Sequence, residues 1–339
     1  MSKRIKVAFD LGNNSLKIGA WKKGGLELHE LPLPENLMEE DSVLMPHAFS
    51  AFLKKAKKEL RLPGGPAGLL LPPSQVICRL VTMPRMSVEQ LMLNLPYEFS
   101  DFIHGEPGQY YCDYALCRET EEVPEGEGEP PLTMMAAVAQ RQQLQDYIRM
   151  FAAGGFALRR ILPQEMALIQ LVEEHCRAHP EGPEEFCFID LGLLSTRVFV
   201  IHRDRVQATR RIHVGCRELD GVVADAFHID RFLADRYKRS DYQGILSHPH
   251  CMEVYEQIGV EALKLINFYH FTYRQNQLSG VYLIGGGAEI APLRQVLEDT
   301  LDLPALPVEE LFPVSLSGPE EAEPYACAVG LMLGGEEEG

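Results

Sequence analysis

The sequence has no apolar run long enough to cross a membrane, and it has few cationic residues. A membrane-spanning helix needs about 20 consecutive apolar residues, and no stretch of the 339 residues reaches that length. Lys and Arg total 32 against 49 Asp and Glu, a formal net charge of −17. That balance disfavours nucleic acids and anionic membranes as direct partners. We expect no signal peptide either, because Asp10 interrupts the first apolar run.

Paired cysteine motifs are also missing. None of the eight cysteines forms a C-x-x-C pair, and no histidine stands at a zinc-ligand spacing from one. Several cysteines lie in apolar runs such as 186–188, which is typical of buried, reduced thiols in a cytosolic protein. The length and the 46% of hydrophobic residues indicate a globular chain of about two domains.

The first half of the sequence predicts strands and a helix, followed by a small mixed unit. Ser87 and Gln90 form a capping-box pattern that predicts a helix start, and Pro96 is expected to kink or divide that helix. The acidic stretch 119–131 is predicted to be a mobile hairpin loop. Hydrophobic periodicity predicts strands at 6–9, 16–21, 26–33, 76–82, 110–117 and 132–139, and helices near 49–60, 87–103, 144–151 and 160–172.

A linker rich in Pro, Gly and Glu at 179–185 is the clearest boundary in the chain. A second series of elements follows it. Strands are predicted at 186–190, 197–201, 206–212 and 281–284, with helical regions ending near Lys238 and spanning 251–277.

The two halves begin with a repeated sequence motif. Residues 10–18 are D-L-G-N-N-S-L-K-I, and residues 190–198 are D-L-G-L-L-S-T-R-V. Asp, Leu, Gly, Ser, a basic residue and a β-branched residue fall at the same offsets. Each copy follows a buried strand and precedes a second one. The pair in matched contexts predicts a duplicated domain.

The repeated residues suit phosphate binding. Glycine allows a tight turn whose successive N–H groups can surround phosphate oxygens. Asn13 and Ser15 can add donors, and Lys17 can add a cation. The aspartates that open the two copies would face each other across a cleft and hold Mg²⁺ through water. The alternative is two ordinary hairpins, and Leu193 and Leu194 weaken the phosphate interpretation for the second copy.

These residues resemble the actin-like ATPase superfamily. The first and second copies are similar to its two phosphate motifs, and Gly285, Gly286 and Gly287 after a buried strand are similar to its adenosine motif. The stretches 163–168 and 325–331 resemble its two connecting helices. By this resemblance Glu165 stands where the superfamily positions water or metal; the alternative is a solvated glutamate at a helix start.

Within the superfamily the sequence resembles the type IV pilus assembly proteins of the PilM family, with the division protein FtsA as a near relative. The resemblance lies in the inserted unit, from 73–79 through 83–86, Tyr97-Glu98 and Asp113-Tyr114. Asp235 and Lys238 resemble the family's acid and lysine that reach the ribose and base, although Asp replaces Glu. The alternative is a pair of exposed helix charges. Gly215-Cys216 replaces the family's Gly-Gly.

The resemblance implies an α/β fold of two duplicated, ribonuclease H-like domains with a small inserted α+β subdomain of FtsA/PilM type. The expected ranges are 1–183 for the first domain, with the insertion at about 72–156. The second domain is expected at 184–312, with a helical subdomain at about 217–278. Residues 313–339 would return to the first domain and end in an acidic tail.

The expected cofactors are ATP and Mg²⁺. Glu165 is the only candidate for catalysis, and Asp10 and Asp190 are the candidates for the metal. The residues expected to bind nucleotide are Asp10, Gly12, Asn13, Asn14, Ser15, Lys17, Asp190, Gly192, Ser195, Thr196, Asp235, Lys238, Gly285, Gly286 and Gly287.

The resemblance implies a cytoplasmic scaffold for pilus assembly. It would bind the N-terminal cytoplasmic peptide of a PilN-like inner-membrane protein, and other pilus components, and so reach the membrane through a partner. ATP hydrolysis is expected to be weak or absent. The alternatives are an FtsA-like cytoskeletal protein, a type II secretion relative, and a small-molecule kinase on the same core.

Overall fold

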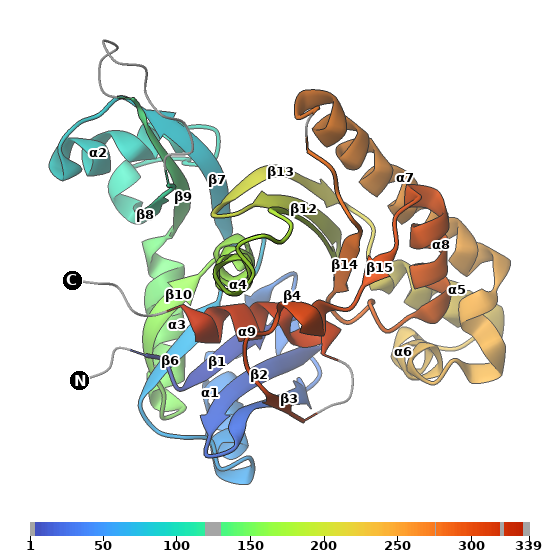
Figure 1. Cartoon of the computed structure of the whole chain (residues 1–339). Helices are drawn as coiled ribbons and strands as arrows, with labels where there is room; N and C mark the ends of the chain where they lie inside the picture. Colours follow the sequence, from blue (N-terminus) through green and yellow to red (C-terminus); the bar gives the residue numbers. More distant parts are fainter. Residues whose placement is uncertain (1–3, 119–129, 275, 319–321, 335–339) are drawn as a thin grey trace.

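The computed structural model of the chain describes residues 4–118, 130–274, 276–318 and 322–334 (Figure 1). Its first sheet has six strands in the order β10-β6-β1-β2-β3-β16. The strands are β1 (Val7–Leu11), β2 (Ser15–Lys22), β3 (Gly25–Pro32), β6 (Pro66–Leu70), β10 (Ala157–Leu162) and β16 (Leu316–Ser317). The short pair β4 (Met38–Glu39) and β5 (Ser42–Val43) lies between β3 and the next helix.

The second sheet has five strands in the order β13-β12-β11-β14-β15. They are β11 (Glu185–Leu191), β12 (Thr196–His202), β13 (Arg205–Ile212), β14 (Val281–Ile284) and β15 (Ala305–Leu306). Strand β11 pairs antiparallel with β12 and parallel with β14, as β1 does with β2 and β6.

The two sheets repeat each other in register as well as in order. Asp10 on β1 stands opposite Lys17 on β2, and Asp190 on β11 stands opposite Arg197 on β12. On the other side, Asp10 is paired with Leu70 of β6 and Asp190 with Ile284 of β14. The repeated sequence motif therefore occupies the same place in two matching sheets.

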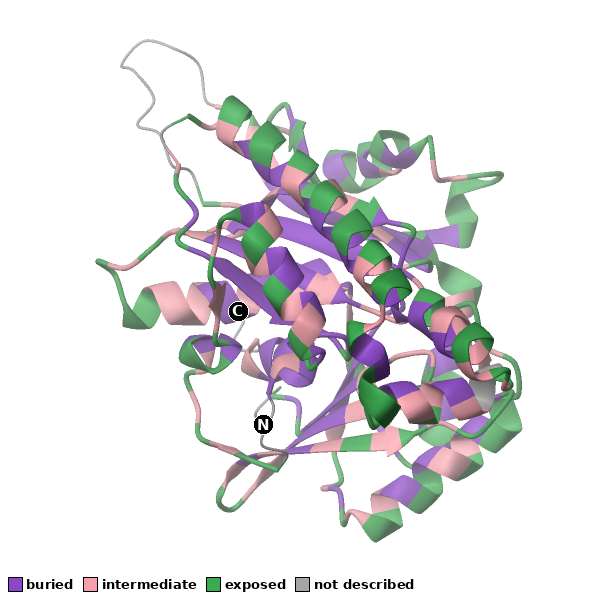
Figure 2. Ribbon diagram, turned by 90° about the vertical axis from the view of Figure 1, so that its right-hand side faces the viewer, coloured by how far each residue is buried: buried purple, intermediate pink, exposed green. Residues whose placement is uncertain are grey.

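Helices cover both sheets, and two of them lie between the sheets (Figure 1). Both sheets are largely buried, whereas the outer helices show one buried and one exposed side (Figure 2). The first sheet is flanked by α1 (Pro46–Glu59) and α3 (Arg141–Ala153), and the second by α7 (Pro249–Thr272) and α8 (Ala291–Leu301). The central pair is α4 (Gln164–Ala178) and α9 (Ala326–Leu333).

One apolar core runs through both halves at this central pair. It joins α4 and α9 to side chains of both sheets, including Leu26 and Phe199. The two helices approach closely at Gly330, where a Cβ atom would lie 2.1 Å from the Ala167 carbonyl oxygen. Only glycine allows that approach, so α4 and α9 pack directly against each other at this point.

The inserted unit is a three-stranded sheet in the order β7-β9-β8. Its helix begins at the predicted capping box of Ser87 and Gln90, and Pro96 marks the change to a 3₁₀ turn. The elements are β7 (Val76–Met83), α2 (Val88–Asn94), η1 (Leu95–Phe99), η2 (Pro107–Gln109), β8 (Tyr110–Leu116) and β9 (Leu132–Gln140).

The remaining elements belong to the second half and the return of the chain. They are α5 (Cys216–Phe227), α6 (Arg231–Arg239), η3 (Tyr242–Ser247), η4 (Val308–Leu311) and η5 (Glu323–Tyr325).

The sequence-based prediction was wrong at one helix and missed β6 and the two-residue strands β4, β5, β15 and β16. Residues 157–162 form β10 rather than the start of a helix, because Pro163 ends the strand and stands as N-cap of α4. Strand β6 was not predicted, since Pro66 and Gly68 resemble turn residues. Most of the acidic stretch 119–131 and the acidic C-terminal run lie outside the described residues.

Candidate functional site

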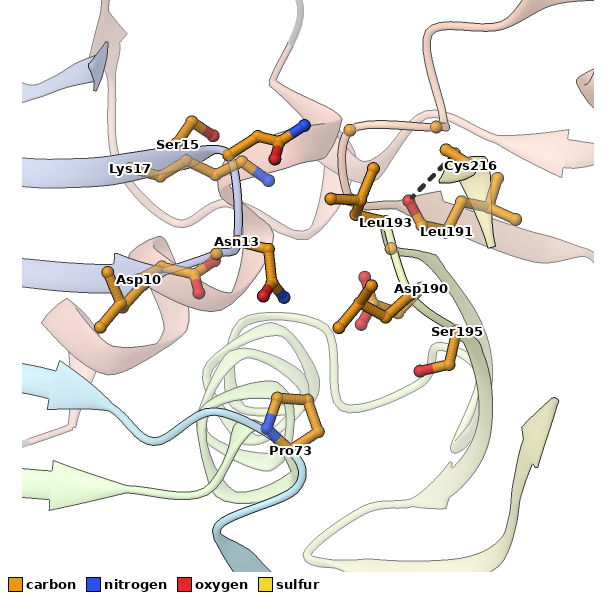
Figure 3. Close-up of a pocket in the computed structure, with 18 of the residues that line it drawn as sticks. Asp10, Asn13, Ser15, Lys17, Pro73, Asp190, Leu191, Leu193, Ser195 and Cys216 are labelled. Atoms are coloured by element: carbon orange, nitrogen blue, oxygen red, sulfur yellow. Dashed lines mark hydrogen bonds between the residues drawn. The ribbon is translucent and has the colours of Figure 1, made fainter. Parts of the chain in front are cut away.

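A cavity of about 600 Å³ lies between the two repeated turns. Figure 3 shows Asp10 and Asp190 on opposite sides of it, with Asn13 and Pro73 on its walls. The glycines after β14 and the residues of α6 close the remaining sides. Of the residues predicted to bind nucleotide, those that line the cavity are Asp10, Gly12, Asn13, Asn14, Ser15, Lys17, Asp190, Gly192, Ser195, Asp235, Lys238, Gly285, Gly286 and Gly287.

The first turn is polar, and hydrogen bonds to residues outside the turn hold it in place. The Gly12 amide donates to the Ser15 carbonyl at 3.0 Å, which closes the turn. Asn13 and Asp41 exchange two hydrogen bonds, of 2.6 Å from Asn13 Nδ2 to Asp41 Oδ1 and 3.0 Å from the Asp41 amide to Asn13 Oδ1. Gln75, which precedes β7, donates to the Asp41 carbonyl at 2.6 Å. The first turn is therefore linked to the base of the inserted unit.

The second turn is held by the start of α5. The amides of Cys216 and Arg217 donate to the carbonyls of Gly192 and Leu193 at 3.0 and 2.9 Å. Gly215 precedes them, and a Cβ there would lie 2.5 Å from the Leu193 carbonyl oxygen. These contacts direct carbonyl oxygens of the turn toward protein donors.

Three residues of the second repeat are poorly suited to bind phosphate. Leu193 and Leu194 line the cavity with apolar side chains. Thr196, predicted to bind nucleotide, is fully buried and does not line the cavity. The second turn therefore offers fewer side-chain donors than the first.

The three glycines after β14 have different surroundings. Gly285 has φ +83°, and a Cβ there would lie 2.6 Å from Asp190 Oδ1. At Gly287 a Cβ would lie 2.7 Å from Cys216 Sγ, whereas nothing stands within 4 Å at Gly286. The first and third glycines thus let β14 pack on the second turn, and the middle one faces open space.

The two aspartates have different partners. The surrounding protein raises the pKa of Asp10 because burial disfavours its charge; Lys17 opposes this effect, and Asp190 adds to it. Asp190 accepts a hydrogen bond from Gln164 Nε2 at 3.0 Å, and its Oδ2 lies 3.8 Å from Arg197 Nε. Asp10 makes no hydrogen bond with its carboxylate in the described part of the chain.

Glu165 does not line the cavity, and Gln164 takes that place. The Glu165 side chain is buried, and its Oε1 accepts from Arg197 Nη1 at 3.3 Å. On α4 a step of one residue turns a side chain by about 100°. The carboxylate predicted for catalysis therefore points into an ion pair, and a neutral amide faces the cavity.

Lys238 lies in a buried charge cluster at one end of the cavity. Its Nζ is 2.5 Å from Asp220 Oδ1 and 3.1 Å from Asp235 Oδ1. Burial opposes its charge, but the two carboxylates outweigh burial and raise the pKa of Lys238. The predicted pair of Asp235 and Lys238 is thus present at the cavity wall, with Asp220 as a third member.

The residues present fit a nucleotide with a magnesium ion. Six carboxylates and four cationic side chains line the cavity, so an anionic polyphosphate would meet excess negative charge without a metal. Among the described residues no group of three or more His, Cys, Asp or Glu could hold a metal. Mg²⁺ commonly takes one or two carboxylates and completes its shell with phosphates and water, and Asp10 and Asp190 can supply the carboxylates.

Several site residues were not predicted from the sequence. Gln164 adjoins the predicted Glu165, and only the phase of α4 separates them. Arg197 was noticed as the basic residue of the repeat but not as part of the site. Cys216 was noticed only as a departure from the family's Gly-Gly, whereas Asp41 and Asp220 come from segments without a binding motif, and no local signal marks them.

The chain matches a known protein family over most of its length. The model of the family described as type IV pilus assembly protein PilM matches residues 9–334. The chain belongs to the PilM family. No curated protein sequence matches it.

Solved structures confirm the fold of this PilM family member. A PilM–PilN type IV pilus biogenesis complex matches with a TM-score of 0.75 and 22% identity, over 97% of each chain. The ethanolamine utilization protein EutJ from Carboxydothermus hydrogenoformans matches with 0.57 and 16% identity, over 97% of this chain and 89% of that one.

A solved structure with bound ADP has the same fold. MreB5 of Spiroplasma citri bound to ADP matches with a TM-score of 0.52 and 11% identity, over 97% and 95% of the two chains. The predicted duplicated, actin-like α/β fold is confirmed. In the described residues, no helix is both long and apolar enough to span a bilayer.

Proposed function

We propose that the chain is a cytoplasmic, ATP-binding scaffold for the assembly of a type IV pilus or a related pilus or competence system. The observation that carries this proposal is the convergence of the two repeated turns on one cavity in a member of the PilM family. The nucleotide would lie with its phosphates between the turns, Mg²⁺ at Asp10 and Asp190, and its base near Gly286.

The proposed partner is a PilN-like inner-membrane protein, bound through its N-terminal cytoplasmic peptide. The match to a PilM–PilN complex over nearly the whole chain supports this choice. The scaffold would then reach the inner membrane through its partner, where it would recruit other pilus components. The links from Asn13 through Asp41 to Gln75 support an effect of nucleotide on the inserted unit.

A peptide-binding experiment tests the proposal. The cytoplasmic tail of the PilN-like protein is immobilised, and binding of the whole chain is measured with Mg²⁺–ATP, with ADP and without nucleotide. A tail of the same composition in scrambled order is the control. We expect specific binding that ATP strengthens. No specific binding in any nucleotide state would contradict the scaffold.

We propose that ATP hydrolysis is weak or absent. A general base accepts a proton from the attacking water. Gln164 can orient such a water but cannot accept its proton, and Glu165, the carboxylate predicted for catalysis, is paired with Arg197. The same pairing disfavours a kinase. The test is phosphate release under single-turnover conditions; release at rates typical of enzymes, about 1 s⁻¹ or faster, would contradict the proposal.

A further inference from the structure

The unusual group at the cavity is Arg197 on β12. Its side chain is 9% exposed, yet it lines the cavity. Its guanidinium carbon lies 4.9 Å from the centre of the Phe199 ring, within the range of a cation–π contact. Arg197 is therefore a buried cation placed beside the second turn.

The hydrogen bonds of Arg197 are incomplete. Nη1 donates to Glu165 at 3.3 Å, and Nε lies 3.8 Å from Asp190, beyond hydrogen-bond distance. Nε and Nη2 have no hydrogen-bond partner in the described part of the protein. A buried guanidinium with unused donors is costly unless something accepts from them.

An anionic acceptor is the chemistry that suits these donors. A guanidinium presents its N–H groups in a planar fork that matches phosphate oxygens. Lys17 of β2 also lines the cavity. It stands opposite Asp10 on the neighbouring strand, as Arg197 stands opposite Asp190. Each repeated aspartate thus has one cation opposite it, in addition to Lys238 and Arg239 of α6 at the cavity wall.

We propose that Arg197 recognises the terminal phosphate of the bound nucleotide and so makes the site selective for the triphosphate over the diphosphate. This inference rests on the proposed nucleotide site. Glu165 and Asp190 hold the guanidinium in place, and Arg197 is a specificity-determining residue that the family resemblance did not assign.

The test compares the affinities of the whole chain for ATP and ADP, both with Mg²⁺, by calorimetry. Removing Arg197 alone would leave Glu165 buried without its partner, so the main variant is the double substitution R197Q/E165Q. The variant E165Q alone retains the guanidinium and serves as control. The variant R197K keeps the charge but loses the planar fork, and it covers the case in which the double variant does not fold.

The expected result is a ratio of ATP to ADP affinity of about tenfold or more in the wild type, from charge-assisted hydrogen bonds to the extra phosphate. E165Q keeps most of that ratio, because the amide oxygen of a glutamine still accepts from Arg197 Nη1 and only the charge of Glu165 is lost. R197Q/E165Q reduces it to about one and R197K reduces it several-fold, with ADP affinity almost unchanged. A ratio that survives in R197Q/E165Q, or an equal loss for both nucleotides, would overturn the inference. Absence of binding to wild-type protein would instead refute the nucleotide site itself.

Discussion

The two repeated turns occupy matching places in their sheets but have different surroundings. The first turn is lined by small polar residues, and Asp41 and Gln75 fasten it to the base of the inserted unit. The second turn has two leucines on the cavity, and the first amides of α5 cap its carbonyls. A shared backbone plan has therefore been kept while the side-chain chemistry of the copies has diverged.

The two halves would act differently in the proposed nucleotide site. The first turn would offer amide and hydroxyl side chains to phosphate, and the second contributes Asp190, Arg197 and close packing with the glycines after β14. The largest effects should come from the packing of the second turn, and the smallest from its leucines.

The largest effect is expected from Gly285→Ala. Its φ of +83° and the approach of Asp190 leave no room for a Cβ, so we expect the free energy of unfolding to fall by about 2 kcal/mol or more and nucleotide affinity to fall with it. The matched control is Gly286→Ala, where space is open. Urea unfolding measures both. Equal stabilities of the two variants would contradict the assigned packing.

Asp10→Asn and Asp190→Asn test whether the two halves share one metal. Each variant should bind ATP about tenfold or more weakly in the presence of Mg²⁺, because both carboxylates are needed to hold the metal ion that offsets the charge of the phosphates. In EDTA all three proteins should bind ATP weakly, and the variants at least as tightly as the wild type, because each has lost one negative charge at the cavity. A loss confined to one of the two variants would place the metal in one half only.

The same two substitutions should differ in their effect on stability. Burial raises the pKa of Asp10 above its ordinary 3.8, so the folded chain keeps that proton where the unfolded chain has released it. The free energy of unfolding therefore falls as the pH rises from 3.8 through the folded pKa. Asp10→Asn removes this loss.

The expected result is that Asp10→Asn is more stable than the wild type at pH 7 and equal to it near pH 4. Asp190→Asn should not gain stability, because its carboxylate already accepts from Gln164 and lies beside Arg197. Thermal unfolding of both variants across this pH range measures the difference. Destabilisation by Asp10→Asn at pH 7 would show that its carboxylate is satisfied in the fold.

The smallest effect is expected from Leu193→Asn. An amide in place of this cavity-lining leucine adds one donor to the second turn, so ATP affinity should rise by about threefold, a fraction of a hydrogen bond's usual contribution. Leu93→Asn, at an exposed leucine of α2 that does not line the cavity, controls for general effects of an added amide. Weaker ATP binding by Leu193→Asn would mean that the leucine contacts the nucleotide.

The sequence predicted the features that local patterns encode. The repeat, the capping box at Ser87 and strand β14 were all found with their correct type, because each depends on neighbouring residues. Pro163 explains the one wrong helix: the apolar residues before it continue the helical pattern of α4, but they pair with β6 as a strand. No short stretch of sequence encodes the parallel pairing of strands that lie far apart in the chain.

The sequence predicted those site residues that belong to recognisable motifs. The turn residues and glycines line one cavity as the repeat implied. The choice between Gln164 and Glu165 depends on the rotation of one helix, and the burial of Arg197 depends on side chains from two elements far apart in the chain. Contacts between elements decide both, so the sequence alone could not assign them.

The most direct test is hydrogen exchange of the whole chain with and without Mg²⁺–ATP, followed at peptides covering residues 10–17 and 190–197. We predict slower exchange in both peptides on addition of ATP, and no such change in Asp10→Asn at the same concentration. Protection of one peptide alone, or of neither while ATP is bound, would contradict a nucleotide held between the two turns.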